Sequence, residues 1–286
     1  MKDLIISLEA TCDLPENLIK KYDLKIADME FIVDDEIYST NKDNVQSSHL
    51  YEKMRKGSKT KTSQINEESY IEFFEKLLKE NKPILHLAFS SGQSATYHSA
   101  VSAANKIKEK YKDSKIIVVD SLCSCSGHGF YAILVRKFAD DANSLDDVVK
   151  YAEYLKYKII HSFSVDDLKY LYRGGRIKQS VAIIGTILKI KPVLKVDDDG
   201  RLVQVKNVVS RKRALKAIYD GFKESYDKNF DICFISHADC LVDAEYIANL
   251  IKDETNVNPT ITNLGPIIGS HSGPGTIALF FVASKR

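Results

Sequence analysis

Residues 84–111 read ILHLAFSSGQSATYHSAVSAANKIKEKY, and the fold can be predicted outward from this stretch. Ile84–Phe89 is a short apolar run typical of a buried strand, whereas Thr96–Tyr111 has the residue spacing of a helix. Ile116–Val119 follows as a β-branched strand. Strands that alternate with helices are joined by crossover connections, so we predict a largely parallel sheet flanked by helices.

The remainder of the first half repeats this alternation. Asp13 is expected to cap a helix that has Pro15 in its first turn, and Ser144 and Asp147 form a capping box for a later helix. The expected elements are a strand over Leu4–Ser7 and helices over Leu14–Tyr22, Glu67–Lys79, Gly129–Ala139 and Ser144 to about Tyr157.

The second half has a different character. Asp197–Gly200 contains an Asp-Gly turn between two apolar runs, which predicts a hairpin and therefore antiparallel strands. The expected strands are Ile159–Phe163, Val193–Val196, Leu202–Val208, Ile232–Ser236 and Thr276–Ala283. The expected helices are Asp166–Tyr172, Lys178–Leu188, Arg211 to about Tyr226 and Leu241–Lys252.

These patterns predict an α/β fold of two lobes, with a largely parallel N-terminal sheet and a mixed or antiparallel C-terminal lobe. The change of pattern places the boundary near residue 157, which gives an N-terminal lobe of residues 1–157 and a C-terminal lobe of residues 158–286. Because no low-complexity linker separates them, we expect the lobes to pack closely.

Composition excludes several function classes. The 286 residues include 41 Lys and Arg against 39 Asp and Glu, a formal charge of +2. Such an even mixture argues against nucleic acid or a membrane surface as the main partner. No apolar run approaches the roughly 18 residues that a membrane span needs, and the N-terminal run is expected to be a strand and not a signal peptide.

The five cysteines predict reduced thiols in a cytoplasmic protein, because their number is odd and their spacing shows no disulfide framework. Cys123 and Cys125 form a C-x-C pair, but a structural zinc site needs about four ligands, so no metal site is predicted.

Two enzyme-like motifs depart from the patterns of known enzymes, one in its residues and the other in its position. Gly92–Thr96 begins like a G-x-S-x-G nucleophile elbow but lacks the last glycine, which leaves a serine/histidine acyl hydrolase using Ser94 and His271 as one alternative. Gly127–Ala132 matches G-x-G-x-x-A but begins too far after its strand for the dinucleotide fingerprint. A nucleotide-binding regulator is the second alternative.

Three polar segments suit an anionic ligand. They are Lys61–Gln64, expected to be a polar turn, Ser90–Thr96 between a strand and a helix, and Gly269–Gly275, expected to be a tight turn that holds His271 between strands. In an open α/β sheet, ligands bind beyond the carboxyl ends of the strands, where helix N-termini direct amides at anions. Taken singly, the two Ser/Thr segments are better explained as N-caps, and His271 could be a solvated loop residue.

In this order, the segments resemble motifs of the DegV family of bacterial fatty-acid-binding proteins, over essentially the whole chain. Thr11 and Asp13-Leu14-Pro15 are similar to the family's D-S-T-x-D-L-P, Lys61–Gln64 to its T-S-Q segment, and Ser90–Tyr97 to S-S-G-L-S-G-T-Y. Val119-Asp120-Ser121, Leu168–Ile177 and Ile268–Leu279 are similar to its D-S, L-x-x-L-x-K-G-G-R-I and I-G-x-H-T-G-P-G-x-x-x-L motifs.

The resemblance implies a long-chain fatty acid, such as palmitate or oleate, held between two α/β lobes. It implies that Thr62 and Ser94 bind the carboxylate and that His271, Ser63 and Gly92 lie near the head group. It also implies an inter-lobe wall that contains Arg176. Apolar residues that would suit a tunnel for the tail are Ile183, Ile184, Ile187 and Leu188, although core packing explains them equally well.

The resemblance further implies a cytoplasmic carrier that is not an enzyme, acts in lipid transport or fatty acid metabolism, and needs no cofactor besides its ligand. The expected partner is a fatty acid kinase that forms the acyl phosphate. The chain departs from the pattern at Glu9-Ala10, which replaces D-S, and at Val209, which takes the place of an arginine in V-R-T-R-K. The oligomeric state cannot be predicted from these patterns.

Overall fold

The computed structural model describes all residues except 2, 42–46, 179–189 and 285–286. In it, Ile84–Ala88 of the quoted stretch form an interior strand of a parallel sheet. The sheet has the order β2 (Leu24–Ala27), β1 (Ile5–Glu9), β6 (Ile84–Ala88) and β7 (Ile116–Asp120). The chain leaves β1 toward β2 and leaves β6 toward β7. The loops after β1 and β6 therefore diverge at the carboxyl edge of the sheet, the usual place for a ligand.

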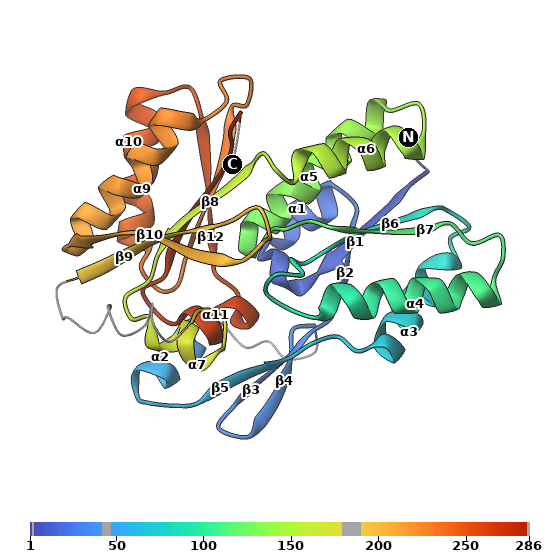
Figure 1. The fold of residues 1–286 in the computed structure, drawn as a ribbon, viewed down its shortest axis with the longest axis horizontal. Helices are drawn as coiled ribbons and strands as arrows, with labels where there is room; N and C mark the ends of the chain where they lie inside the picture. The colour runs from blue at the N-terminus through green and yellow to red at the C-terminus, as the bar shows by residue number, and fades with distance from the viewer. Residues whose placement is uncertain (2, 42–46, 179–189, 285–286) are drawn as a thin grey trace.

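Helices cover both faces of this first sheet (Figure 1). α3 (Glu67–Leu78) and α4 (Thr96–Lys110) lie on one face, and α5 (Cys125–Asp141) and α6 (Leu145–Leu155) lie on the other. The short α1 (Glu16–Lys21) packs beside β2. The predicted parallel sheet with flanking helices is confirmed.

A second sheet is mixed, as predicted. Its order is β10 (Leu202–Val209), β9 (Ile190–Val196), β8 (Ile159–Ser164), β13 (Ile277–Val282), β11 (Ile232–His237) and β12 (Asn258–Asn263). All neighbours in it are antiparallel except β11 and β12. α9 (Arg211–Ser225) and α10 (Leu241–Glu254) pack on one face, while α5 contacts β8, β11 and β13 from the other.

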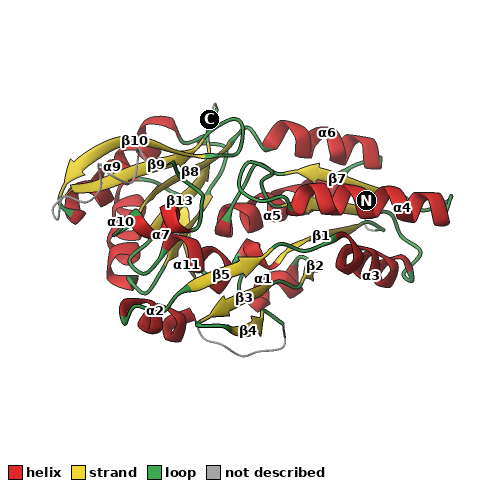
Figure 2. Ribbon diagram, turned by 60° about the horizontal axis from the view of Figure 1, so that its bottom comes forward, coloured by secondary structure: helices red, strands yellow, loops and turns green. Residues whose placement is uncertain are grey.

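A third, smaller sheet was not predicted. It contains β4 (Glu36–Ser39), β3 (Glu30–Val33) and β5 (Thr60–Ser63), all antiparallel, with α2 (Ser47–Arg55) following β4 in the chain. β5 packs against α11 (Pro266–Ser272), and α7 (Lys169–Arg173) packs on the same short helix (Figure 2). A third set of strands thus borders the space between the two larger sheets.

Three local predictions were wrong for identifiable reasons. Asp13 does not cap α1, because Pro15 takes that position and the Asp13 carboxylate is turned inward to accept a hydrogen bond from the Cys125 thiol at 3.0 Å. Residues 60–63 form β5 and not a turn, since β3 supplies a pairing partner that is distant in sequence. His271 lies in α11 and not in a turn between strands.

The N-terminus of α5 also differs from the prediction. The helix begins at Cys125, four residues before the expected Gly129, and thereby contains the G-x-G-x-x-A motif. A Cβ atom at Gly127 would lie 2.4 Å from Phe280 Cδ1 and 2.6 Å from His161 Nε2. The glycine therefore permits close packing of α5 on the second sheet, which leaves it no surface for a phosphate.

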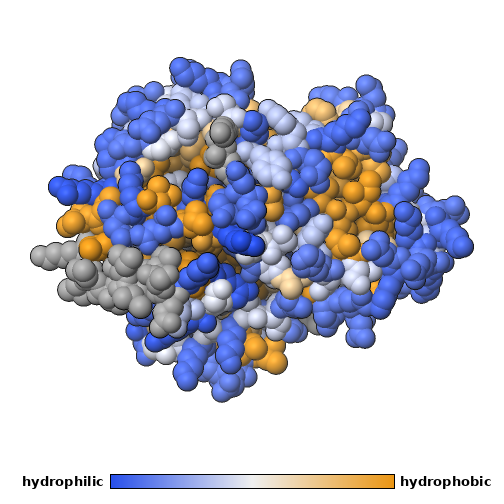
Figure 3. Space-filling model, in the orientation of Figure 1, coloured by the Kyte–Doolittle hydropathy of each residue, from blue (hydrophilic) through white to orange (hydrophobic). Residues whose placement is uncertain are grey.

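One hydrophobic core continues from the first sheet through α5 into the second sheet. Phe130 of α5 packs on Phe234 of β11 with ring centroids 5.3 Å apart. A smaller cluster lies beneath α9 and α10. On the outside, Figure 3 shows a mainly hydrophilic face, in keeping with the mixed charges of the chain. The boundary near residue 157 stays a prediction.

Candidate functional site

A cavity of about 310 Å³ lies where the three sheets meet, a size within the range of small-molecule sites. Its walls come from β5, the loop after β6, the start of α5, β8, β13, α7 and α11. The apolar wall residues are Met29, Phe89, Phe163, Leu171, Val196, Leu202, Leu264, Ile267, Ile268, Ala278 and Phe280. Most of them are distant in sequence, so the cavity exists only in the folded chain.

Thr62 and His271 form the central polar contact of this cavity. Thr62 Oγ1 lies 2.7 Å from His271 Nε2, while His271 Nδ1 is buried against Gly174 and has no hydrogen-bond partner in the part of the chain that the structure describes. Burial, and then the positive charge of Arg176, lower the pKa of His271 to about 3, so the imidazole is neutral. If the proton is on Nε2, the unpaired Nδ1 is a hydrogen-bond acceptor and not a buried N–H donor. We therefore assign Nε2–H as the donor to Thr62 Oγ1. The Thr62 hydroxyl can then donate to a ligand.

Ser94 lies on the same cavity, at the start of α4. Its Oγ accepts a hydrogen bond from the Thr96 backbone N–H at 3.3 Å and lies 2.8 Å from Thr96 Oγ1. Arg176 joins this wall because its Nε donates to the carbonyl oxygen of Gln93 at 3.1 Å. Burial lowers the pKa of Arg176, but a guanidinium keeps its charge. Of the residues expected near a head group, Thr62, Ser63, Ser94 and His271 all line the cavity, as does Arg176.

Gly92 has a different place. A Cβ atom there would lie 2.4 Å from the Asp199 carbonyl oxygen, so the glycine allows the turn between β9 and β10 to pack on the loop after β6. Ser90 Oγ and Gln93 Nε2 both donate to the Gly200 carbonyl oxygen, at 2.7 and 3.0 Å. Gly92 is thus part of the loop after β6, but it does not itself line the cavity.

The expected tail residues Ile183, Ile184, Ile187 and Leu188 lie outside the described residues, as does most of the predicted helix over Lys178–Leu188. The apolar wall described above comes from other parts of the chain, chiefly β8, β13 and α11.

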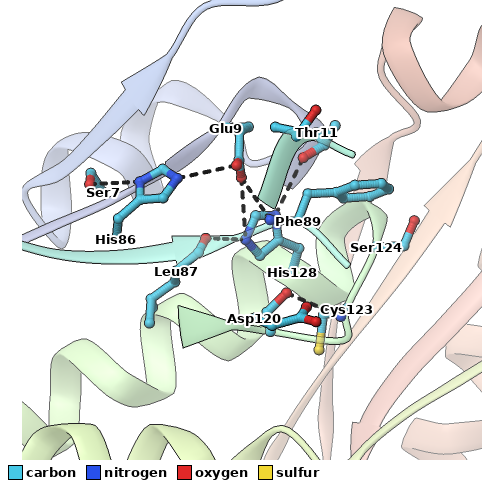
Figure 4. A network of polar contacts seen from close by, with 12 residues as sticks. Ser7, Glu9, Thr11, His86, Leu87, Phe89, Asp120, Cys123, Ser124 and His128 are labelled. Atoms are coloured by element: carbon cyan, nitrogen blue, oxygen red, sulfur yellow. Dashed lines mark hydrogen bonds and ion pairs between the residues drawn. The ribbon is translucent and has the colours of Figure 1, made fainter. Parts of the chain in front are cut away.

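Sequence reasoning missed a buried polar network behind the cavity wall, which Figure 4 shows. Glu9 accepts hydrogen bonds from Tyr70 Oη and from the Phe89 backbone N–H at 2.9 Å, and its Oε1 lies 3.2 Å from His86 Nε2. Burial alone would raise the pKa of Glu9, but His86, and then His128 and Tyr70, hold it at about 2. The available signal was an acidic residue just after the strand predicted over Leu4–Ser7.

His128 links this network to the cavity. Its Nε2 donates to the Leu87 carbonyl oxygen at 2.7 Å, which leaves Nδ1 to accept from Thr11 Oγ1 at 3.4 Å. Burial lowers the pKa of His128, so this imidazole is also neutral. Thr11 and Phe89 both line the cavity, so the network positions two wall residues.

The arrangement does not form a nucleophile and base pair at Ser94. His271 Nε2 contacts Thr62, and His271 Nδ1 has no partner among the described residues. A hydrolase would need an imidazole nitrogen within hydrogen-bond reach of the serine. The described residues also contain no group of three or more His, Cys, Asp or Glu side chains that could hold a metal ion, and no helix long and apolar enough to cross a bilayer.

The fold and the cavity define a class of α/β protein with an internal site, in which hydroxyl, imidazole and guanidinium groups face apolar walls. The chain belongs to the DegV family, whose model it matches over residues 4–284. It is 36% identical to a DegV domain-containing protein of Clostridium perfringens, over 100% of this chain and 99% of the relative. A DegV domain-containing protein of Lactococcus lactis is also 36% identical, with 98% of each chain covered.

Solved structures have the same fold. DegV, a fatty acid binding protein from Bacillus subtilis, superposes with a TM-score of 0.84 at 26% identity, over 99% of each chain. A fatty-acid-binding DegV family protein from Thermus thermophilus has a TM-score of 0.89 at 24% identity, over 98% of this chain and 99% of the other. The α/β architecture of this chain is therefore that of the DegV family.

Proposed function

We propose that the protein binds one long-chain fatty acid in the cavity, with its carboxylate at Thr62 and Ser94 and its tail along the apolar walls. The observation that carries this proposal is the Thr62–His271 contact inside a cavity whose other walls are mainly apolar. The solved relatives from Bacillus subtilis and Thermus thermophilus, described as fatty acid binding, support the same ligand.

The polar side chains suit a buried carboxylate, which is costly to bury without partners. The Thr62 hydroxyl is oriented as a donor by His271, and Ser94 can donate when Thr96 donates to it. Hydrogen bonds to a charged group contribute roughly 1.5–3 kcal/mol each. The guanidinium of Arg176 adds a positive charge to the same cavity. Ser63 is the further head-group neighbour that we propose.

The apolar walls supply most of the affinity in this proposal. At about 0.8 kcal/mol for each buried methylene, a dozen methylenes contribute on the order of 10 kcal/mol before ordering costs. A carboxylate site with only two or three donors would then determine the orientation of the ligand, while the tail determines how tightly it is held. Such a site needs no nucleophile, cofactor or metal, so we propose a carrier and not an enzyme.

We further propose that this carrier acts in the cytoplasm and presents its ligand to a fatty acid kinase. The region of the V-R-T-R-K motif differs from the family pattern in a way that bears on this partner. Val209, at the end of β10, is 52% exposed where the family has an arginine. Arg211 is engaged with Asp243, with Nε 2.9 Å from Oδ2. A kinase that docks here would meet an apolar side chain.

Native mass spectrometry of freshly purified protein, followed by lipid extraction, tests the ligand. We expect one long-chain fatty acid per chain. Protein that is consistently empty and that also ignores added palmitate and oleate would refute the proposal. Turnover of acyl esters that is abolished by Ser94→Ala would instead favour the hydrolase.

A further inference from the structure

Ser124 occupies a position where its hydroxyl should cap a helix, yet it does not. It is the N-cap residue of α5 and has extended backbone angles, but its side chain makes no capping hydrogen bond. Ser144, the N-cap of α6, accepts a hydrogen bond from the Asp147 N–H at 3.2 Å in the ordinary way. Both backbone groups of Ser124 are engaged, since its N–H donates to His161 Nε2 at 3.0 Å and its carbonyl oxygen accepts from the His128 N–H at 3.2 Å.

The Ser124 hydroxyl is instead available to the cavity. Ser124 is 7% exposed and lines the cavity. In Figure 4 Ser124 lies beyond the Phe89 ring, on the side away from the Glu9–His128 network. The structure gives the Ser124 hydroxyl no hydrogen-bond partner among the described residues, so it can bond to a group that enters the cavity.

The wall around Ser124 is more polar than a plain hydrocarbon tail requires. Thr11 and Cys125 line the same cavity, and the hydroxyl of Ser272, a further wall residue, is buried with no hydrogen-bond partner among the described residues. Ser124 and Cys125 also begin the 17-residue α5, whose N-terminal amides favour an oxygen acceptor. An alkyl chain laid over this wall would leave the Ser124 hydroxyl desolvated and unsatisfied.

The charge behind the wall restricts which oxygen group fits. The Asp13 carboxylate accepts a hydrogen bond from the Cys125 thiol at 3.0 Å, and the Glu9 carboxylate is bound to the backbone N–H of Phe89. The ionised Glu9 carboxylate behind this wall would repel a second carboxylate. A neutral hydroxyl or keto group meets no such repulsion. Either group can accept a hydrogen bond from the Ser124 hydroxyl.

We propose that the cavity accepts an acyl chain that carries a neutral oxygen, a hydroxyl or keto group, along its length, and that Ser124 binds this oxygen. The inference rests on the proposed function, because it needs the carboxylate to be held at Thr62 and Ser94. It adds a substrate class, the oxygenated long-chain fatty acids, and a specificity-determining residue.

Calorimetric titration of delipidated protein tests the proposal. The ligands are stearate and a set of octadecanoic acids with one hydroxyl or keto group at different positions, and the proteins are wild type, Ser124→Ala and Ser124→Thr. For at least one isomer, we expect Ser124→Ala to weaken binding about two- to tenfold, while stearate binds Ser124→Ala at least as tightly as wild type. Ser124→Thr keeps a hydroxyl and should retain the preference for that isomer.

Ser144→Ala is the matched control, since it removes the hydroxyl of an N-cap serine that is not among the cavity residues. Ser144→Ala should leave the ratio of the affinities for the oxygenated isomer and for stearate unchanged. The proposal is overturned if Ser124→Ala changes the affinity for every isomer by the same factor as for stearate. If neither stearate nor any isomer binds the wild-type protein, the proposed function itself fails.

Discussion

At the scale of single residues, two neutral imidazoles organise the cavity. His271 orients the Thr62 hydroxyl from one side, and His128 orients the Thr11 hydroxyl from the other. Both pKa values are lowered by burial, so neither ring supplies a positive charge to the ligand. The charge that complements a carboxylate must therefore come from Arg176, and the hydrogen bonds from hydroxyl groups.

Thr62→Val tests the role of that hydroxyl with little change of shape. We expect the dissociation constant for palmitate to rise about ten- to 150-fold, because the variant loses a hydrogen bond to a charged group. Hexadecanol, which has the same tail without the charge, should lose much less affinity, and Thr62→Ser should keep most of the palmitate affinity. Equal losses for the acid and the alcohol would mean that Thr62 does not contact the carboxylate.

Two buried carboxyls should give opposite pH dependences of stability. The pKa of Glu9 is lowered to about 2, so its contribution is present above its unfolded value near 4.5 and is lost as the pH falls toward 2. Burial raises the pKa of Asp13 to about 7, so the fold favours its protonated form and loses stability as the pH rises from about 4 to 7. The Cys125 thiol and Gly265 only partly oppose this effect.

Urea unfolding at a series of pH values checks both signs. Relative to wild type, Glu9→Gln should remove on the order of 3 kcal/mol of stability above pH 4.5 and much less near pH 2. Between pH 4 and pH 7, the unfolding free energy of Asp13→Asn should rise relative to that of wild type by on the order of 4 kcal/mol. Parallel curves for wild type and either variant would contradict the assigned direction for that residue.

At the scale of elements, α5 connects the two larger sheets. Thirteen of its side-chain positions are buried, because the first sheet and α6 cover one side and β8, β11 and β13 cover the other. At Gly127 the helix lies close to Phe280 and His161, and both of these side chains are cavity residues. The packing of this helix therefore determines the shape of the cavity.

Two glycine substitutions in helices should have opposite effects. Gly127→Ala places a methyl group against Phe280 and should cost about 1–3 kcal/mol of unfolding free energy, with weaker palmitate binding. Gly221→Ala in α9 meets nothing within 4 Å and should stabilise by about 0.5–1 kcal/mol, with binding unchanged. Thermal unfolding measures the stability of the two variants, and palmitate titration measures their binding. A Gly127→Ala protein as stable as wild type would show that α5 can shift to accommodate the methyl group.

At the scale of the whole molecule, the core is continuous across both larger sheets. A lobe that unfolded alone would expose the shared face of α5, so the sheets should unfold together. The cavity has walls from all three sheets, and bound ligand therefore stabilises the molecule as one unit.

Scanning calorimetry should show one transition with equal calorimetric and van't Hoff enthalpies. Palmitate at about a hundred times its dissociation constant should raise the unfolding free energy by about 2.7 kcal/mol and shift the whole transition. Two resolved transitions, of which only one responds to palmitate, would show that the lobes are independent.

Local patterns were enough to predict the elements whose signals lie within one segment. The strand and helix over residues 84–111, the hairpin turn at Asp197–Gly200 and the Ser144 cap all depend on neighbouring residues. The motifs likewise identified Thr62, Ser94, Arg176 and His271, which the fold brings to one cavity. The roles of these four residues at a carboxylate remain predictions.

Other features depended on partners far away in the chain. β5 forms because β3 pairs with it. The Asp13 side chain turns inward because the Cys125 thiol and the Gly265 backbone donate hydrogen bonds to its carboxylate. Glu9 is ionised because His86 lies beside it. The Ser124 hydroxyl could not be distinguished from an ordinary N-cap until α5 was seen to leave it uncapped. Propensity and motif act over a few residues, whereas burial and pairing depend on the packing of the whole chain, and that packing alone determined the cavity.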